Sequence, residues 1–553
     1  MAKKQLALRI SAVLLAASSL LASCGDSPSS SSPSSGASSE AMSSSAPENS
    51  GTIENFNETG YPIVNEKITL TMMHTLNTGR GDWSELAYFQ DMEELTNIHW
   101  EFVGVASENW AEKKNLALAS GDYPDLFWAG TDTSDEQKYG VDTGVFQNIK
   151  DLIPKYMPNL SKVLADNPDA ANGIKASDGN IYMLPYLADT LTMADSTIYY
   201  RKDWLKKVGK EVPTTVDELT DVLRAIKTLG DDIYPLMPQP NTSGNNAAEN
   251  FLYAAFGEDL EPHFVVDENG TVSYSPLSEQ FEHFITYMNA LYTEQLLDNE
   301  CYTQTTEQAT AKLKNNQAGF VTWGTGLTAE NFESGELEVG LLAPLTSEYY
   351  DKQHVRKYSG IYLGYGVITD KNKYPEATLR YLDINYAEEE VAPDTGLYCL
   401  APWLGPEGKG FEFTNAEKTT YARLKPADSQ LSELEYTDRY WAPGTGPCRL
   451  VTDAVPEKNP GQEMKANESK ANWYPYMVPG FPDGLLRYES EDFDRMTPLW
   501  TDINSYYLQC RAKFVSGQMP LSEMDTFRET LKKMGIDEVV AIKQKAYDKF
   551  IGK

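Results

Sequence analysis

The chain has 553 residues, a net charge of −34 and an aromatic content of 11%. One hydrophobic core rarely serves more than about 250–300 residues, so at least two domains are expected. The negative charge disfavours nucleic acids and anionic membrane surfaces as partners, because both carry phosphate charges of the same sign.

The N-terminus has the layout of a secretory signal peptide. A basic start precedes an apolar run of 13 residues from Ile10 to Ala22. This run is shorter than the roughly 17 to 25 residues that a membrane-spanning helix needs. The residues Leu-Ala-Ser-Cys at 21–24 resemble a bacterial lipobox, in which the cysteine is diacylated and begins the mature protein. We therefore expect removal of residues 1–23 and a lipid on Cys24. The alternative is a plain signal peptide in which Cys24 is incidental.

Residues 24–60 are expected to form a flexible tether. The stretch 27–45 contains 12 serines and two prolines, and Glu40 is its one charged residue. It shows no apolar periodicity, so it cannot bury enough surface to offset the entropy of ordering it. Folding should then begin near Tyr61. The folded part would lie on the extracellular face of the cell membrane, held there by the lipid alone.

Strand and helix patterns alternate at the start of the folded part. Strand patterns occur at 67–73, 99–105 and 125–128, and helix patterns occur between them at 83–96 and 110–119. Strands connected by helices pair in parallel through right-handed crossovers. The pattern therefore predicts the α/β class.

Later helices carry recognisable ends. Thr215 and Glu218 fit a capping box, a run of apolar residues at helical spacing follows, and Gly230 is expected to end the helix. Further helices are predicted at 522–534 and 537–550. These segments place a group of helices at the C-terminal end of the chain.

The sequence carries no recognisable catalytic or cofactor motif. Its histidines form no HExxH pair, and it lacks a Walker A loop, a GxSxG elbow and a GxGxxG loop after a strand. Asp267–Gly270 lacks the EF-hand spacing and is interpreted as a hairpin turn. The cysteines at Cys301, Cys399, Cys448 and Cys510 are too widely spaced for a structural zinc site. We expect no catalytic residue, metal or cofactor. Cys399 with Cys448 is the first disulfide to test.

Several stretches occur in a characteristic order. They are Ser120–Phe127 (SGDYPDLF), Asp178–Tyr186 (DGNIYMLPY), Tyr200–Gly209, Leu313–Trp323 (LKNNQAGFVTW), Tyr374–Ala377 (YPEA) and the tail Phe514–Phe550. Together they resemble the extracellular solute-binding proteins (family 1) of bacterial ABC importers, in the large lipoprotein branch that binds carbohydrates. The resemblance implies a two-lobed, hinged α/β fold of the periplasmic-binding-protein type (type II). It also implies a carbohydrate ligand, delivery to the permease subunits of an ABC importer, and a monomer.

The resemblance suggests a division into lobes. The expected segments are 61–186 and 323–360 in lobe 1, 187–322 and 361–500 in lobe 2, and helices packed on both lobes at 501–553. The chain is expected to cross between lobes near 186–195, 320–326 and 358–366. Pro185 is expected to end a strand of lobe 1, because proline cannot donate to a strand ladder.

Residues after strand ends are the expected ligand contacts. Open α/β sheets bind ligands beyond the carboxyl ends of their strands, and the apolar face of a sugar ring stacks on aromatic side chains. The predicted set is Arg80, Asp82, Trp83, Trp128, Asp132, Tyr186, Trp323, Tyr362, Tyr365 and Trp441. The alternative for each member is a structural role, such as inward packing of Trp83.

Two other functions stay open from the sequence. A secreted glycan hydrolase would need a carboxylate pair, and 81 acidic residues make such a pair easy to draw anywhere. An adhesin or a sensory module could use the same fold without transport. Monosaccharides, oligosaccharides and uronate-containing sugars are all compatible with the predicted set.

Overall fold

The computed structural model describes residues 55–76, 79–190, 197–238, 247–258, 263–322, 337–357, 359–452 and 454–553. The expected signal peptide and Cys24 lie outside the described residues. Among the helices of the described ranges, none is both long enough and apolar enough to cross a bilayer.

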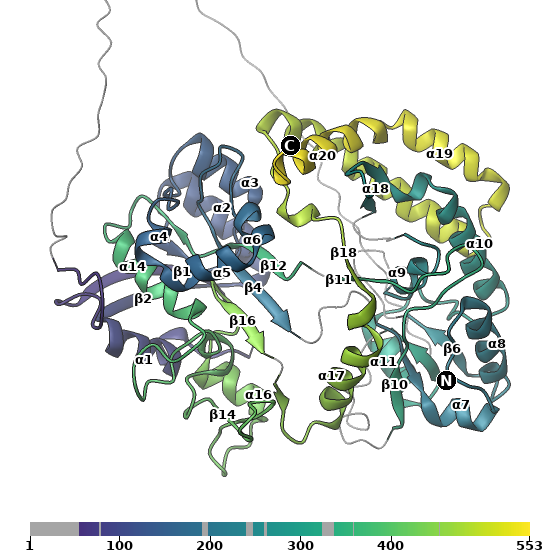
Figure 1. The fold of residues 1–553 in the computed structure, drawn as a ribbon, viewed down its shortest axis with the longest axis horizontal. Coiled ribbons are helices and arrows are strands. Elements are labelled where there is room, and N and C mark those ends of the chain that lie inside the picture. The colour runs from purple at the N-terminus through teal and green to yellow at the C-terminus, as the bar shows by residue number, and fades with distance from the viewer. Residues whose placement is uncertain are drawn as a thin grey trace, which may run out of the picture. The chain divides into compact units, whose positions relative to one another are not determined.

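The N-terminal series of strands and helices forms the first sheet and the helices that connect its strands (Figure 1). Its strands are, in spatial order, β13 (Val367–Ile368), β3 (Leu126–Phe127), β1 (Ile68–Leu76) and β2 (Ile98–Ala106). β1 pairs in parallel with both β2 and β3, which confirms the predicted βαβ arrangement. Its helices include α1 (Ala87–Thr96), α2 (Trp110–Ser120), α5 (Pro158–Asp166) and α14 (Pro375–Asp383). We call this part lobe 1.

The second sheet is mixed. Its strands are, in spatial order, β10 (Val339–Leu341), β5 (Tyr199–Arg201), β9 (Ala318–Val321) and β6 (Tyr234–Met237). β6 and β9 are parallel, whereas β5 is antiparallel to both of its neighbours. We call this part lobe 2.

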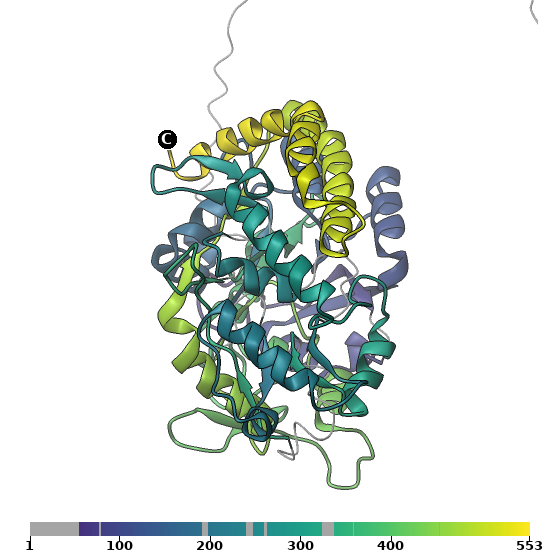
Figure 2. The same ribbon diagram turned by 90° about the vertical axis from the view of Figure 1, so that its right-hand side faces the viewer.

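Lobe 2 has the larger core. It unites residues of α8 (Val216–Lys227), α9 (Ala247–Ala254) and α10 (Glu279–Thr293) with the C-terminal helices α18 (Ser490–Val515), α19 (Met524–Lys533) and α20 (Ile536–Phe550). Figure 2 shows these C-terminal helices, in yellow-green and yellow, beside the teal helices of lobe 2. The helices predicted at 522–534 and 537–550 are therefore confirmed.

Local signals placed several elements correctly. Thr215 Oγ1 accepts a hydrogen bond from the Glu218 amide at 3.1 Å, as predicted for the start of α8. The Glu218 carboxylate instead accepts from the amide of Thr214 at 2.8 Å, one residue earlier than in a capping box. The hairpin predicted around Asp267–Gly270 is confirmed by the antiparallel pair β7 (Phe264–Val266) and β8 (Val272–Tyr274).

A three-stranded sheet lies where the chain passes between the two lobes. It contains β4 (Leu184–Thr190), flanked by the antiparallel β12 (Ile361–Tyr365) and the parallel β16 (Arg449–Thr452). β4 leads from lobe 1 toward β5, β12 leads back to β13, and β16 leads to α17 (Pro460–Asn472), which packs beside β10. We call this the crossover sheet.

The strand pairing corrects the expected lobe boundaries. β10 pairs in the lobe 2 sheet, so the described part of the segment expected to return to lobe 1, residues 337–357, begins in lobe 2. β13 pairs in the lobe 1 sheet, so the chain after residue 361 re-enters lobe 1 and does not continue in lobe 2 to residue 500. Most of the crossing expected near 320–326 lies outside the described residues, and β16 is a crossing that the sequence did not predict. Short apolar strands look alike in a sequence, and only their partners show which sheet they join.

Pro185 lies inside β4 and does not end the strand. The pairing register of β4 with β12 shifts between Tyr362 and Tyr365, opposite this part of β4. A residue without an amide hydrogen is tolerated next to such an irregularity, because no regular ladder bond is lost there. The strand therefore carries Tyr186 within the crossover sheet.

The four cysteines of the described chain are buried free thiols. Cys399 and Cys448 lie in one cluster of buried residues against the crossover sheet, but no disulfide joins them. Burial raises the pKa of Cys399 to about 11, so its thiol stays protonated at neutral pH. The disulfide proposed as the first to test is therefore absent from this structure.

Candidate ligand-binding site

Two loops of lobe 1 carry half of the predicted set of ligand contacts. A third segment, distant in the chain, packs against both loops. Arg80 follows β1 and Trp128 follows β3. The Arg80 guanidinium donates to the carbonyl oxygen of Pro443 at 2.5 Å, and Trp128 Nε1 donates to the carbonyl oxygen of Thr445 at 2.7 Å. Segment 437–447 therefore covers the carboxyl edge of the lobe 1 sheet, a position that the sequence signalled only through Trp441.

The charge of Arg80 is already paired. Its guanidinium lies 3.5 Å from the Asp438 carboxylate, and both side chains are largely buried. Gly444 has a φ of 96°, and a Cβ at this position would overlap the guanidinium. Glycine is therefore needed for the close approach, and it fixes the orientation of Arg80.

The carboxylates of Asp82 and Asp132 are exposed and held in place. Asp82 Oδ1 accepts hydrogen bonds from the amide and the hydroxyl of Ser84 at 2.9 and 2.7 Å, which lower the pKa of Asp82. Asp132 Oδ1 accepts from the amides of Ser134 and Asp135 at 2.8 and 2.9 Å. Both carboxylates can accept hydrogen bonds from ligand hydroxyls without first being ordered by the ligand.

Trp83 and Trp128 lie beneath these loops with exposed fractions of 4% and 1%. The indole of Trp83 stacks on the His74 ring at a centroid distance of 3.6 Å. It also meets the Trp128 indole edge to face, with the two ring centroids 5.7 Å apart. Both rings are covered by protein, so their observed role is to support the loops. Their contact with a ligand stays a prediction.

We expect His74 to make folding stability depend on pH. Burial lowers the pKa of His74 to about 4, whereas an exposed histidine titrates near 6.5. Between these values the unfolded chain binds a proton that the folded chain excludes, so stability falls as the pH falls. His74→Phe keeps a ring against Trp83 and removes this proton uptake. Urea unfolding at pH 7 and at pH 4.5 measures the effect. Over this range the free energy of unfolding of the parent protein should fall by about 2 kcal/mol more than that of the variant.

The matched control for this prediction is His99→Gln. His99 is half-buried, and its Nδ1 lies 2.6 Å from Glu93 Oε2. An unchanged pH dependence in His74→Phe would contradict the assignment to His74.

The crossover sheet presents a group of three tyrosines. Tyr186 on β4 lies opposite Tyr362 on β12, and their rings stack at 5.5 Å with an interplanar angle of 26°. The Tyr365 ring lies 5.7 Å from that of Tyr186. Tyr186 is buried, whereas Tyr362 is 44% exposed. The structure therefore brings together three members of the predicted set and leaves one supported ring exposed.

The tyrosine group is joined to the β3 loop through Gly364. The Thr131 amide donates to the Gly364 carbonyl oxygen at 3.3 Å. Gly364 has a φ of 89°, and a Cβ there would overlap the Thr131 carbonyl oxygen. This contact brings β12 against the segment that leads from Trp128 to Asp132.

The remaining tryptophans of the predicted set are Trp441 and Trp323. Trp441 Nε1 donates to the carbonyl oxygen of Leu424 at 2.7 Å, so this half-buried indole anchors segment 437–447. Trp323 lies outside the described residues. Tyr440 of the same segment, which is not in the predicted set, is 37% exposed, and its ring centroid lies 4.6 Å from that of Tyr436. Its only signal was its position beside Trp441.

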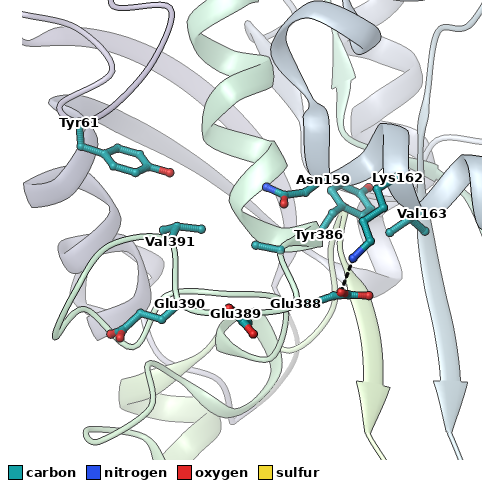
Figure 3. Close-up of a pocket in the computed structure, with 10 residues that line it drawn as sticks. Tyr61, Asn159, Lys162, Val163, Tyr386, Glu388, Glu389, Glu390 and Val391 are labelled. Atoms are coloured by element: carbon teal, nitrogen blue, oxygen red, sulfur yellow. Dashed lines mark hydrogen bonds and ion pairs between the residues drawn. The ribbon is translucent and has the colours of Figure 1, made fainter.

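A pocket of about 520 Å³ lies in lobe 1, and its described lining includes none of the predicted residues. Figure 3 shows the side chains around it, with Lys162 Nζ paired to Glu388 Oε2 at 2.6 Å. Glu388 also binds Arg449 at 2.7 Å. These ion pairs tie α5 to the start of β16, so the arrangement supports the fold. Within the described ranges, no cluster of three or more potential metal ligands occurs.

Comparison with known proteins identifies the family. The model for bacterial extracellular solute-binding proteins matches residues 82–390. The fructooligosaccharide ABC transporter substrate-binding protein FusA of Streptococcus pneumoniae is 28% identical over 98% of each chain. The structure of FusA in complex with kestose is 26% identical, has a TM-score of 0.67, and covers 88% of this chain and 100% of FusA. Lipoprotein LipO of Bacillus subtilis is 24% identical over 50% of this chain and 54% of LipO. The chain therefore belongs to the bacterial extracellular solute-binding proteins, the two-lobed α/β components that bind the substrates of ABC transporters.

Proposed function

We propose that this protein is a lipid-anchored receptor that captures an oligosaccharide by closing its lobes and delivers it to an ABC permease. The observation that carries the proposal is the similarity to FusA, which extends over 98% of both chains. A fructooligosaccharide is the ligand that this similarity favours. The lipid anchor is supported by the sequence around Cys24 and by the similarity to a lipoprotein.

Charges near the strand ends favour a neutral sugar over a polyanion. Arg80 is paired with Asp438, and the exposed Asp132 carboxylate lies 3.9 Å from Lys114 Nζ, whereas Asp82 is an exposed carboxylate held by Ser84. Arg439 adds one exposed cation. Sugar hydroxyls can donate to the carboxylates, but an acidic sugar would meet repulsion from them.

An exposed ring on the crossover sheet supports the proposed binding mode. Tyr362 can stack on the C–H face of a sugar, and Tyr186 holds its ring from below. A ligand that contacts both lobes favours the closed state through its higher affinity for that state.

Membership of a binding-protein family argues against the hydrolase alternative. An adhesin or a sensory module would share the binding step but not the permease.

Titration of the mature protein with kestose tests the proposal. We expect saturable binding with one dominant site by calorimetry, a smaller radius of gyration at saturation by solution scattering, and no new reducing ends. The control ligand is a polygalacturonate oligomer, whose charge should prevent tight binding. No heat with kestose or with any other neutral oligosaccharide, or an unchanged radius of gyration at saturation, would contradict capture by closure.

A further inference from the structure

A second pocket, of about 630 Å³, borders the crossover sheet. Its walls come from three parts of the chain. Asn167, which caps α6 (Pro168–Gly173), belongs to lobe 1, Ser359 and Ile361 lie at the start of β12, and Trp500 and Asn504 belong to α18 of lobe 2. The pair of parallel strands β11 (Val355–Lys357) and β18 (Met477–Pro479) completes the wall. None of the nine predicted contacts that lie in the described ranges lines this pocket.

The pocket and the tyrosine group lie on opposite faces of β12. Neighbouring side chains of a strand point to opposite faces of its sheet. Ile361 lines the pocket and packs with Leu187, whereas Tyr362 stacks on Tyr186. The pocket is therefore a separate cavity that shares a strand with the proposed site.

An aromatic ring forms part of the pocket wall. Trp500 is half-buried, and its ring lies 5.2 Å from Phe264 and 5.9 Å from His263. Lys543 Nζ lies 6.0 Å from its centroid. These contacts hold the indole from the lobe 2 side. A ring held in this way can receive the C–H face of a sugar at little cost in side-chain entropy.

The polar atoms of the wall favour a ligand with hydroxyl groups. Asn504 lines the pocket, and its Oδ1 lies beneath the protein surface and accepts no hydrogen bond within the described part of the chain. A buried acceptor without a donor is costly, so a ligand hydroxyl that Oδ1 meets after a turn of the side chain is favoured over an anion. Asn167 uses its Oδ1 to accept from the Ala170 amide at 3.1 Å, which leaves its amide hydrogens for an acceptor. The lining also includes two cations and two carboxylates, Arg356, Lys357, Asp169 and Asp483, whose formal charges balance. A wall with no net charge and with these donor and acceptor needs matches a neutral carbohydrate.

We propose that this pocket is a second sugar site, which binds one or two sugar units through Trp500 and Asn504. Its volume falls within the roughly 300–1,000 Å³ of small-molecule sites. Because both lobes contribute to its wall, its occupancy is coupled to their closure. Such coupling is reciprocal. An oligosaccharide bound at the tyrosine group changes the affinity of this pocket for sugar, and a sugar bound in this pocket changes the affinity of the tyrosine group for the oligosaccharide by the same factor.

The test uses sucrose as the probe and the mature Tyr362→Ala protein, in which the tyrosine site is weakened. Gly484 lines the pocket, and a Cβ at this position meets open space. Adding Gly484→Trp should fill the pocket and weaken sucrose binding at least tenfold by calorimetry, whereas Gly484→Ala should leave it within twofold. Trp500→Ala should weaken it similarly. Thermal unfolding establishes whether each variant is folded. If Trp500→Ala does not fold, the comparison of Gly484→Trp with Gly484→Ala alone tests the pocket.

Two results would overturn the second site. One is that Tyr362→Ala does not bind sucrose, or that sucrose binds equally well to the two double variants in which Gly484→Trp or Gly484→Ala is added to Tyr362→Ala. The other is preferential binding of glucuronate that Lys357→Gln abolishes, which would assign the pocket to an anion. If neither kestose nor any other neutral oligosaccharide binds the parent protein, the proposed function is rejected, but this pocket's result is unaffected because the two titrations use different variants.

Discussion

Replacing Tyr362 with alanine is expected to weaken oligosaccharide binding at least tenfold and to leave the melting temperature almost unchanged. The ring is 44% exposed and stacks on Tyr186, so a sugar would cover its outer face. Loss of an aromatic platform removes apolar burial and oriented stacking, together about 1.5–3 kcal/mol. A tenfold change in affinity corresponds to about 1.4 kcal/mol. Calorimetry with kestose and thermal unfolding measure the two effects.

Two controls separate stacking from other causes. Tyr362→Phe keeps the ring, so it should retain affinity to within about threefold if stacking dominates. Tyr349→Ala removes another exposed tyrosine, 49% exposed, that belongs to lobe 2. If Tyr362→Ala binds kestose as well as the parent does, the crossover sheet is not part of the site. The loops after β1 and β3, and Trp323, would then be the remaining candidates.

Replacing Cys24 with serine is expected to release nearly all of the protein into the medium. A serine cannot form the thioether that carries the diacyl group of a lipoprotein. Two acyl chains anchor a protein stably because each buried CH₂ contributes about 0.8 kcal/mol, whereas one chain binds only weakly. The measurement is the fraction of the protein that sediments with membranes, compared between the variant and the parent.

Ser30→Ala is the matched control for the anchor, because it changes one serine of the tether and leaves the lipobox intact. It should remain with the membrane fraction. If Cys24→Ser also remains there, the anchor is not attached at this cysteine. If the parent itself is fully released, the alternative of a plain signal peptide is favoured.

Local sequence signals predicted much of the fold. Alternating apolar residues indicated β1 and β2, and the helix patterns between the strands predicted their parallel pairing. The cap at Thr215 and the turn at Asp267–Gly270 were found because their side chains bond to their own neighbouring backbone. Motifs in a characteristic order indicated the family. These features depend on residues close together in the chain, so the sequence alone is sufficient for them.

The arrangement of the site is a different matter. Pairing between β13 and β3, or between β10 and β5, joins segments far apart in the chain, and the sequence contains no local signal for either partner. The burial of Trp83 and the exposure of Tyr362 likewise depend on what packs against them. Both are aromatic residues near strand ends, so their sequence contexts looked equivalent.

The amino-acid sequence by itself thus determined the α/β class, the start of α8, the hairpin at Asp267–Gly270 and the family, because periodicity, caps and motifs are properties of neighbouring residues. The anchor at Cys24 stays a prediction from the same kind of local signal. Only the tertiary structure decided the course of the three crossovers, the docking of segment 437–447 on Arg80 and Trp128, and the single exposed ring of the tyrosine group. These depend on long-range packing, in which the surroundings of a side chain are set by distant parts of the chain.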